Sequence, residues 1–201
     1  MRVLRAALEL LTRERGPVLE DFPDDAPGVP AEGDEAWACP LPLPVPASPA
    51  TGEEAFARQL LAEVGRLRTW HAQAVGKHGR TAFGVSGLGP ERVDELATLI
   101  AAAAFDHLLG TPDGAAVEMP ALLRFAADDL RAFYMEAAAA QPAARKPGPD
   151  DLARWLYGST VLGDAFYMAR DALAAHQDDR TLQTQGRLMV PGAYNRKPGR
   201  Q

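Results

Sequence analysis

The chain has 201 residues, of which 47% are hydrophobic and 24% are charged, and its formal net charge is −6. This length and composition allow a globular core, and the acidic excess argues against bulk electrostatic binding to nucleic acid. A single cysteine excludes an intramolecular disulfide, and no run approaches the roughly 20 apolar residues of a transmembrane helix, so we expect a cytoplasmic protein with no membrane span.

Residues 1–16 predict one amphipathic helix. Arg13 and Arg15 fall in its last turn, where positive charge complements the helix dipole, and Gly16 followed by Pro17 ends it. Charged residues interrupt the apolar run, which favours a helix over a signal peptide. The apolar residues recur at helical spacing: Val3, Leu4, Ala7, Leu8, Leu10 and Leu11.

Residues 17–50 predict a proline-rich acidic arm. The arm holds nine of the 17 prolines and seven acidic residues, but no lysine or arginine. Because proline fixes φ and removes a backbone donor, neither a helix nor a central strand is possible here, and residues 39–46 should be extended. Large apolar groups indicate that part of the arm packs on the helical body or binds a partner. The candidate partner-binding residues are Phe22, Trp37, Cys39, Leu41 and Leu43.

The rest of the chain predicts a helical domain over residues 51–190, followed by a basic tail at 191–201. A capping box at residues 51–54 opens the first helix of this domain, which should end near Gly76. Further helices are predicted within residues 90–110, 119–140, 149–175 and 180–189. The predicted fold class is therefore all-α, a compact bundle of about five to six helices with an extended proline-rich N-terminal arm.

Small residues interrupt the helix predicted for residues 149–175. Gly158, Ser159 and Gly163 lie in its middle, where each glycine costs about 1 kcal/mol relative to alanine. Either the helix breaks there, or the small residues let a neighbouring backbone come close. The apolar spacing continues through the glycines, which favours close packing along an unbroken helix.

The glycine-rich connector at residues 77–89 is the main candidate ligand site. A glycine-rich loop that opens a helix can bind a small anion with its backbone amides, and Arg80, Thr81 and Ser86 would add donors. His71 and His78 flank the connector and could meet the same ligand. The order G-x-x-G-x-G after a helix is typical of neither a dinucleotide-binding turn nor a Walker A loop, so a plain turn between two helices remains the alternative.

No other residues form a recognisable catalytic or metal-binding motif. The histidines and the cysteine lack the spacing of metal ligands, so no metal and no cofactor are predicted. Cys39 could ligate haem or act as a nucleophile, but no base or cation lies near it in sequence, which favours a packed thiol. Asp128, Asp129 and Glu136 could do acid–base work if they are buried, although such a run more often forms the solvated face of a helix.

Three segments resemble a family of uncharacterised bacterial proteins associated with genes related to glycine/sarcosine/betaine reductase; they are residues 16–27, 79–87 and 129–137. The resemblance implies an accessory or partner role to an oxidoreductase. Asp106 and His107 are similar to the aspartate–histidine pair of the TorD-like chaperones of molybdoenzymes, which are all-helical and of similar length. The glutamate and proline expected just before that pair are missing here, so this second likeness is one of class.

Together these features favour a non-catalytic helical accessory or partner protein that serves an oxidoreductase. Its partner would be another protein or a second copy of the chain, and we expect no nucleic-acid or membrane binding. The alternative is a small enzyme or an anion- or small-ligand-binding protein with its site at residues 77–89. A nucleic-acid regulator that uses the basic tail is a third reading, which the net charge disfavours.

Overall fold

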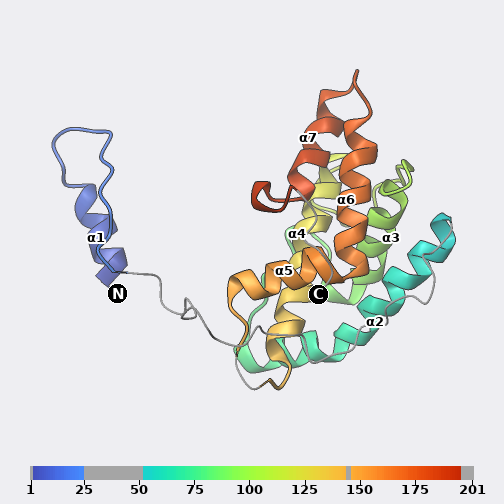
Figure 1. Cartoon of the computed structure of the whole chain (residues 1–201), viewed down its shortest axis with the longest axis horizontal. Helices are drawn as coiled ribbons and strands as arrows, with labels where there is room; N and C mark the ends of the chain where they lie inside the picture. Colours follow the sequence, from blue (N-terminus) through green and yellow to red (C-terminus); the bar gives the residue numbers. More distant parts are fainter. Residues whose placement is uncertain (1, 25–51, 144–145, 196–201) are drawn as a thin grey trace. The chain divides into compact units, whose positions relative to one another are not determined.

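The computed structural model of the chain describes residues 2–24, 52–143 and 146–195. They belong to two compact units, residues 1–35 and 36–201, which are described separately here. Every regular element of the described residues is a helix, which confirms the all-α fold class (Figure 1). Among these helices, none combines the length and the apolar character needed to cross a membrane.

The first unit is a short helix with a segment that turns back along it (Figure 1). Helix α1 spans Arg2–Leu10 and so ends six residues before the predicted stop at Gly16; turn-type hydrogen bonds carry the chain on to Arg13. Two ion pairs hold the returning segment, one between Arg2 and Asp24 and one between Arg13 and Glu20, with the second pair 2.8 Å apart. This part of the predicted arm therefore packs on α1. Residues 25–51 lie outside the described residues, so the extended arm stays a prediction.

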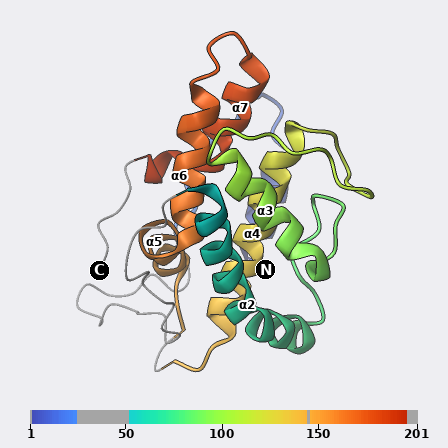
Figure 2. The same cartoon turned by 90° about the vertical axis from the view of Figure 1, so that its right-hand side faces the viewer.

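The second unit is a helical bundle around α4. Its described part holds α2 (Glu53–His78), α3 (Val93–Ala103), α4 (Ala121–Ala140), α5 (Pro149–Ser159), α6 (Val161–Ala174) and α7 (Arg180–Met189), with short 3₁₀ turns η1 (Pro90–Arg92) and η2 (Gly192–Tyr194). Helix α4 packs against α2, α3, α5 and α7, while α6 packs against α3, α5 and α7 (Figures 1 and 2). The six α-helices of this unit agree with the predicted bundle.

The core follows the helical periodicity of the sequence. On α2, the apolar face predicted from spacing is buried at Phe56, Leu60, Val64 and Leu67. Helix α2 begins at Glu53 with Gly52 as its N-cap, whereas Thr51 of the predicted capping box lies outside the described residues. Its end at His78 falls two residues beyond the predicted end, because the chain leaves the helix at Gly79, which adopts the left-handed conformation.

The helix predicted for residues 149–175 is broken, contrary to the expectation of an unbroken helix. Thr160 has extended backbone angles (φ −110°, ψ 154°) and stands between α5 and α6. Its hydroxyl accepts a hydrogen bond from the Gly163 amide at 2.9 Å, which caps the start of α6. The predicted close approach does occur, and the backbone that comes close is that of the preceding helix, α5. A Cβ on Gly163 would lie 2.2 Å from the Leu156 carbonyl oxygen.

The packed bundle extends beyond residue 190. Tyr194 of η2 stacks on Tyr157 with ring centroids 5.0 Å apart, and the Tyr167 hydroxyl donates to the Tyr194 carbonyl at 2.8 Å. Residues 191–195, which the sequence assigns to the basic tail, thus cover part of the α5–α6 surface. Residues 196–201 lie outside the described part of the chain.

Candidate functional site

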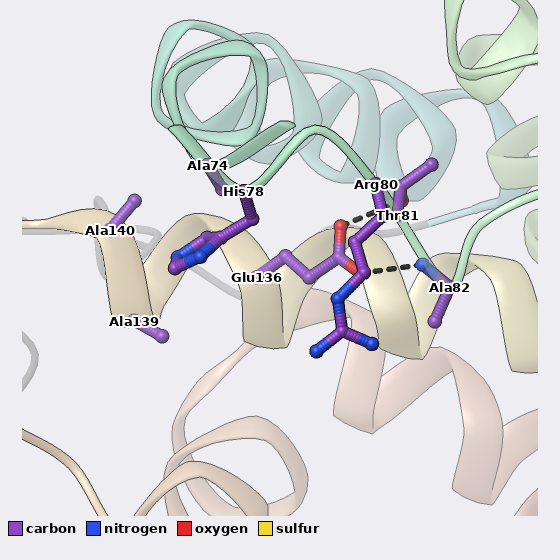
Figure 3. A pocket seen from close by; sticks show the side chains of 8 residues that line it. All are labelled: Ala74, His78, Arg80, Thr81, Ala82, Glu136, Ala139 and Ala140. Carbon is purple, nitrogen blue, oxygen red and sulfur yellow. Dashed lines mark hydrogen bonds between the residues drawn. The ribbon is translucent and has the colours of Figure 1, made fainter. Parts of the chain in front are cut away.

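A cleft opens where the C-terminal end of α2 and the C-terminal half of α4 meet the glycine-rich connector (Figure 3). Its volume is about 370 Å³. Three predicted ligand residues, His78, Arg80 and Thr81, line it, whereas His71 and Ser86 do not. The full lining consists of Ala74, His78, Arg80, Thr81, Ala82, Glu136, Ala139 and Ala140.

The end of α2 places the connector over α4. Gly79 has φ 65°, a conformation that glycine adopts without the steric cost that a Cβ brings, and its amide closes the helix on the Val75 carbonyl at 2.8 Å. The chain then turns so that Arg80 and Thr81 reach the surface of α4. The first glycine of this segment is thus explained by the end of α2 and the turn of the chain that follows it.

Glu136 of α4 binds the connector at Thr81 and Ala82. Its Oε1 accepts the Ala82 amide at 2.7 Å, and its Oε2 accepts the Thr81 hydroxyl at 2.7 Å (Figure 3). The Nε2 atom of His71 lies 3.1 Å from the same Oε2 from the buried side. His71 is 3% exposed and stacks on Phe133, and its burial lowers the pKa of its imidazole while the Glu136 charge opposes that shift. Glu136 therefore joins two of the predicted ligand residues: Thr81, which lines the cleft, and His71, which is buried and does not.

Consecutive backbone amides of the glycine-rich connector bind a carboxylate of the same chain rather than a separate ligand. Asp129 of α4 is fully buried, and its oxygens accept the backbone amides of Gly84, Val85 and Ser86 at 2.7, 2.9 and 3.0 Å. The Ser86 hydroxyl donates to it as well. Such a nest of consecutive amides is a typical anion site. Because Asp129 fills it, Ser86 faces the interior and lies away from the cleft.

Asp129 and Glu136 stand seven residues apart on α4, so they share one face of the helix. The sequence contained a signal for this arrangement. Asp129 falls within the apolar spacing of Ala126, Leu130 and Phe133, which are all buried. A carboxylate on a core-facing stripe requires donors, and the amide-rich connector is where such donors are concentrated.

Another buried carboxylate, Glu63, was not singled out by the sequence. It is 2% exposed and lies on the core side of α2. Its oxygens accept the Tyr134 hydroxyl at 2.9 Å and the amides of Val161 and Leu162 at 2.9 and 3.1 Å, at the first turn of α6. Burial raises the pKa of Glu63 to about 7, although these three hydrogen bonds act in the opposite direction.

The apolar face of α1 is exposed within the first unit. We call Val3, Leu4, Leu8 and Leu11 the α1 stripe; the exposed fractions of the three leucines are 63%, 63% and 80%. Of the predicted partner-binding residues, Phe22 is half-buried in this unit. The others, Trp37, Cys39, Leu41 and Leu43, lie outside the described residues.

The histidines away from the cleft form surface pairs. His107 Nδ1 contacts the Glu53 carboxylate, and His176 Nε2 contacts the Asp106 carboxylate. The adjacent residues Asp106 and His107, which resemble the TorD-like pair, therefore engage different partners and do not act together here. Within residues 2–24, 52–143 and 146–195, no group of three or more histidine, cysteine or acidic side chains could hold a metal ion.

No protein-family model matches the chain, and no curated protein and no solved structure shows significant similarity to it. The two family resemblances seen in the sequence therefore remain predictions.

Proposed function

We propose that the protein is a non-catalytic accessory protein of the cytoplasm that binds another protein through the α1 stripe. The observation that carries this proposal is the exposure of Leu4, Leu8 and Leu11 on one side of α1. Their i, i+4, i+7 spacing is that of the anchor residues of a helix that lies in a partner's groove. Burying a leucine side chain contributes roughly 1.5–3 kcal/mol, so three such anchors offset much of the entropic cost of association.

The ion pairs of the first unit support this role. The pairs of Arg2 with Asp24 and Arg13 with Glu20 hold the returning segment, and the half-buried residues of α1 are Ala6 and Leu10. That arrangement leaves the α1 stripe uncovered within this unit. Exposed ion pairs are individually weak, but these two act together with the half-buried Val18 and Phe22.

The positive charge of Arg5 beside the α1 stripe indicates what kind of surface the partner would present. Arg5 lies on α1 next to Leu8 and has no hydrogen bond or ion pair among the described residues. An apolar groove on another protein, with an acidic rim that faces Arg5, would complement this surface. The sequence resemblance to reductase-associated proteins makes an oxidoreductase the first partner to test.

Two carboxylates of α4 support a non-catalytic role. Asp129 is buried and Glu136 lines the cleft, and each accepts hydrogen bonds from at least two donors of its own chain. A carboxylate held by several fixed donors stabilises the fold and has less capacity to exchange protons with a substrate.

The test is partner capture by the full chain and by two matched variants. Leu8→Gln removes an anchor of the stripe, and Glu9→Gln introduces the same residue at the neighbouring position on the polar face. A stoichiometric protein captured from host extract should be purified and titrated against all three chains. We expect Leu8→Gln to weaken binding about tenfold or more, which corresponds to ~1.4 kcal/mol, and Glu9→Gln to retain it. Equal affinity of the two variants, or the absence of any stoichiometric partner, would refute the proposal.

A further inference from the structure

Two basic side chains line the cleft between α2 and α4, and neither has a partner among the described residues. His78 ends α2 and Arg80 follows it in the connector, and both are exposed. Within the described part of the chain, neither side chain has a hydrogen bond or an ion pair. Figure 3 shows the His78 ring and the Arg80 guanidinium on either side of Glu136. An anion entering this cleft would therefore meet donors that are not already engaged.

Glu136 cannot take the role of that anion. Its Oε1 is bound by the Ala82 amide and its Oε2 by the Thr81 hydroxyl and His71, and it forms no ion pair with Arg80. It nevertheless contributes one negative charge to the wall of the cleft. The charges of Arg80 and Glu136 cancel, so a ligand with one negative charge meets less repulsion from Glu136 than a dianion does.

Besides Thr81, the remaining side chains of the lining are alanine methyl groups. Ala74 comes from α2, and Ala139 and Ala140 come from the last turn of α4. Small side chains leave the volume of about 370 Å³ open, which falls within the usual range of small-molecule sites. The cleft thus offers a charged mouth and an apolar wall, and these suit a ligand with one anionic end and a short hydrocarbon part.

We propose that this cleft binds a small aliphatic carboxylate. The planar Arg80 guanidinium would receive the carboxylate in a two-point hydrogen bond, and His78 would add a donor. The alkyl part would lie against Ala74 and Ala139. A phosphate group matches arginine equally well in geometry, but its second negative charge would lie close to Glu136.

The direct test is an NMR titration of the full ¹⁵N-labelled chain with butyrate, followed by the same titration with inorganic phosphate. Butyrate should give saturable shifts confined to residues 74–82 and 136–140, and phosphate should bind more weakly. The absence of saturable shifts, shifts centred elsewhere, or tighter binding of phosphate would overturn the proposal.

Three variants show which features carry binding. Arg80→Gln should weaken butyrate affinity at least tenfold, because the two-point contact is lost. Ala139→Leu keeps both basic side chains and fills the apolar wall, and it should weaken binding to a similar extent. Arg58→Gln is the matched control, since Arg58 is an exposed arginine of α2 that pairs with Glu54 outside the cleft lining. Unchanged affinity in both Arg80→Gln and Ala139→Leu, or an equal loss in Arg58→Gln, would refute the assignment.

Discussion

Replacing Glu63 with glutamine should remove a pH dependence of stability that this buried carboxyl creates. Burial raises the pKa of Glu63 from 4.5 to about 7 in the folded chain. The unfolded chain exposes the carboxyl, which then titrates near its ordinary value of 4.5. Between these two pH values the native state holds a proton that the unfolded state has lost, so the free energy of unfolding falls as pH rises.

The size of this effect follows from the two pKa values. Each pKa unit corresponds to about 1.4 kcal/mol, so the interval from 4.5 to about 7 amounts to roughly 3 kcal/mol. The contribution is fully present below pH 4.5 and is lost as pH rises through 7. Glutamine also offers one acceptor oxygen to three donors, which costs about 1–3 kcal/mol at every pH and leaves the slope unaffected.

Urea denaturation of the wild type and of Glu63→Gln at pH values from 4 to 8 measures the difference. Other groups, including His71, titrate in both proteins, so their contributions cancel in the difference between the two free energies of unfolding. The stability of the wild type relative to Glu63→Gln should fall by roughly 3 kcal/mol across this range. Tyr134→Phe is the control: it removes a hydrogen bond that lowers the Glu63 pKa, so the fall with pH should persist. A difference between wild type and Glu63→Gln that is constant with pH, or that grows with pH, would refute the reasoning.

Three further predictions concern the connector and the helix break, each measured by urea or thermal unfolding. Asp129→Ala leaves three backbone amides and the Ser86 hydroxyl without their acceptor, and should destabilise the fold by about 3 kcal/mol or more; a loss below 1 kcal/mol would contradict the nest. Gly87→Ala should lower the free energy of unfolding more than Gly79→Ala does. Both glycines have positive φ, but a Cβ would lie 2.6 Å from a backbone atom at Gly87 and would meet open space at Gly79. Equal losses of stability would be inconsistent with that contact. Thr160→Ala should cost about 1 kcal/mol and Thr160→Ser much less, because serine keeps the capping oxygen; equal losses in the two variants would argue against the cap.

The helices were predictable because their signal is local. A repeat of apolar residues every three to four positions marks one face of a helix, and Leu60, Val64 and Leu67 are buried as that spacing indicates. Some helix ends were also readable, since α4 ends at Ala140 and α7 at Met189 as predicted. Others were not: α1 ends at Leu10, before the predicted stop at Gly16, and α3 ends at Ala103 rather than near residue 110. What the spacing could not reveal was the break at Thr160, since the apolar register continues on both sides of it.

The sites were only partly predictable because their partners are distant in sequence. The glycines at residues 79–89 pointed to a loop whose backbone amides could bind an external anion, and that ligand site stays a prediction. The carboxylate that these amides bind is that of Asp129, up to 45 residues further along the chain. The Glu63 carboxylate meets amides as much as 99 residues away. No spacing rule connects such positions.

The sequence by itself thus determined the all-α class, several of the helix ends and an amphipathic α1, since each depends on residues within a few turns of one another. Only the tertiary structure decided which polar groups meet: Asp129 with the connector amides, Glu136 with Thr81 and His71, and Glu63 with the start of α6. The physical reason is that a buried polar group must find a hydrogen-bond partner in space, and the chain brings that partner from wherever packing places it.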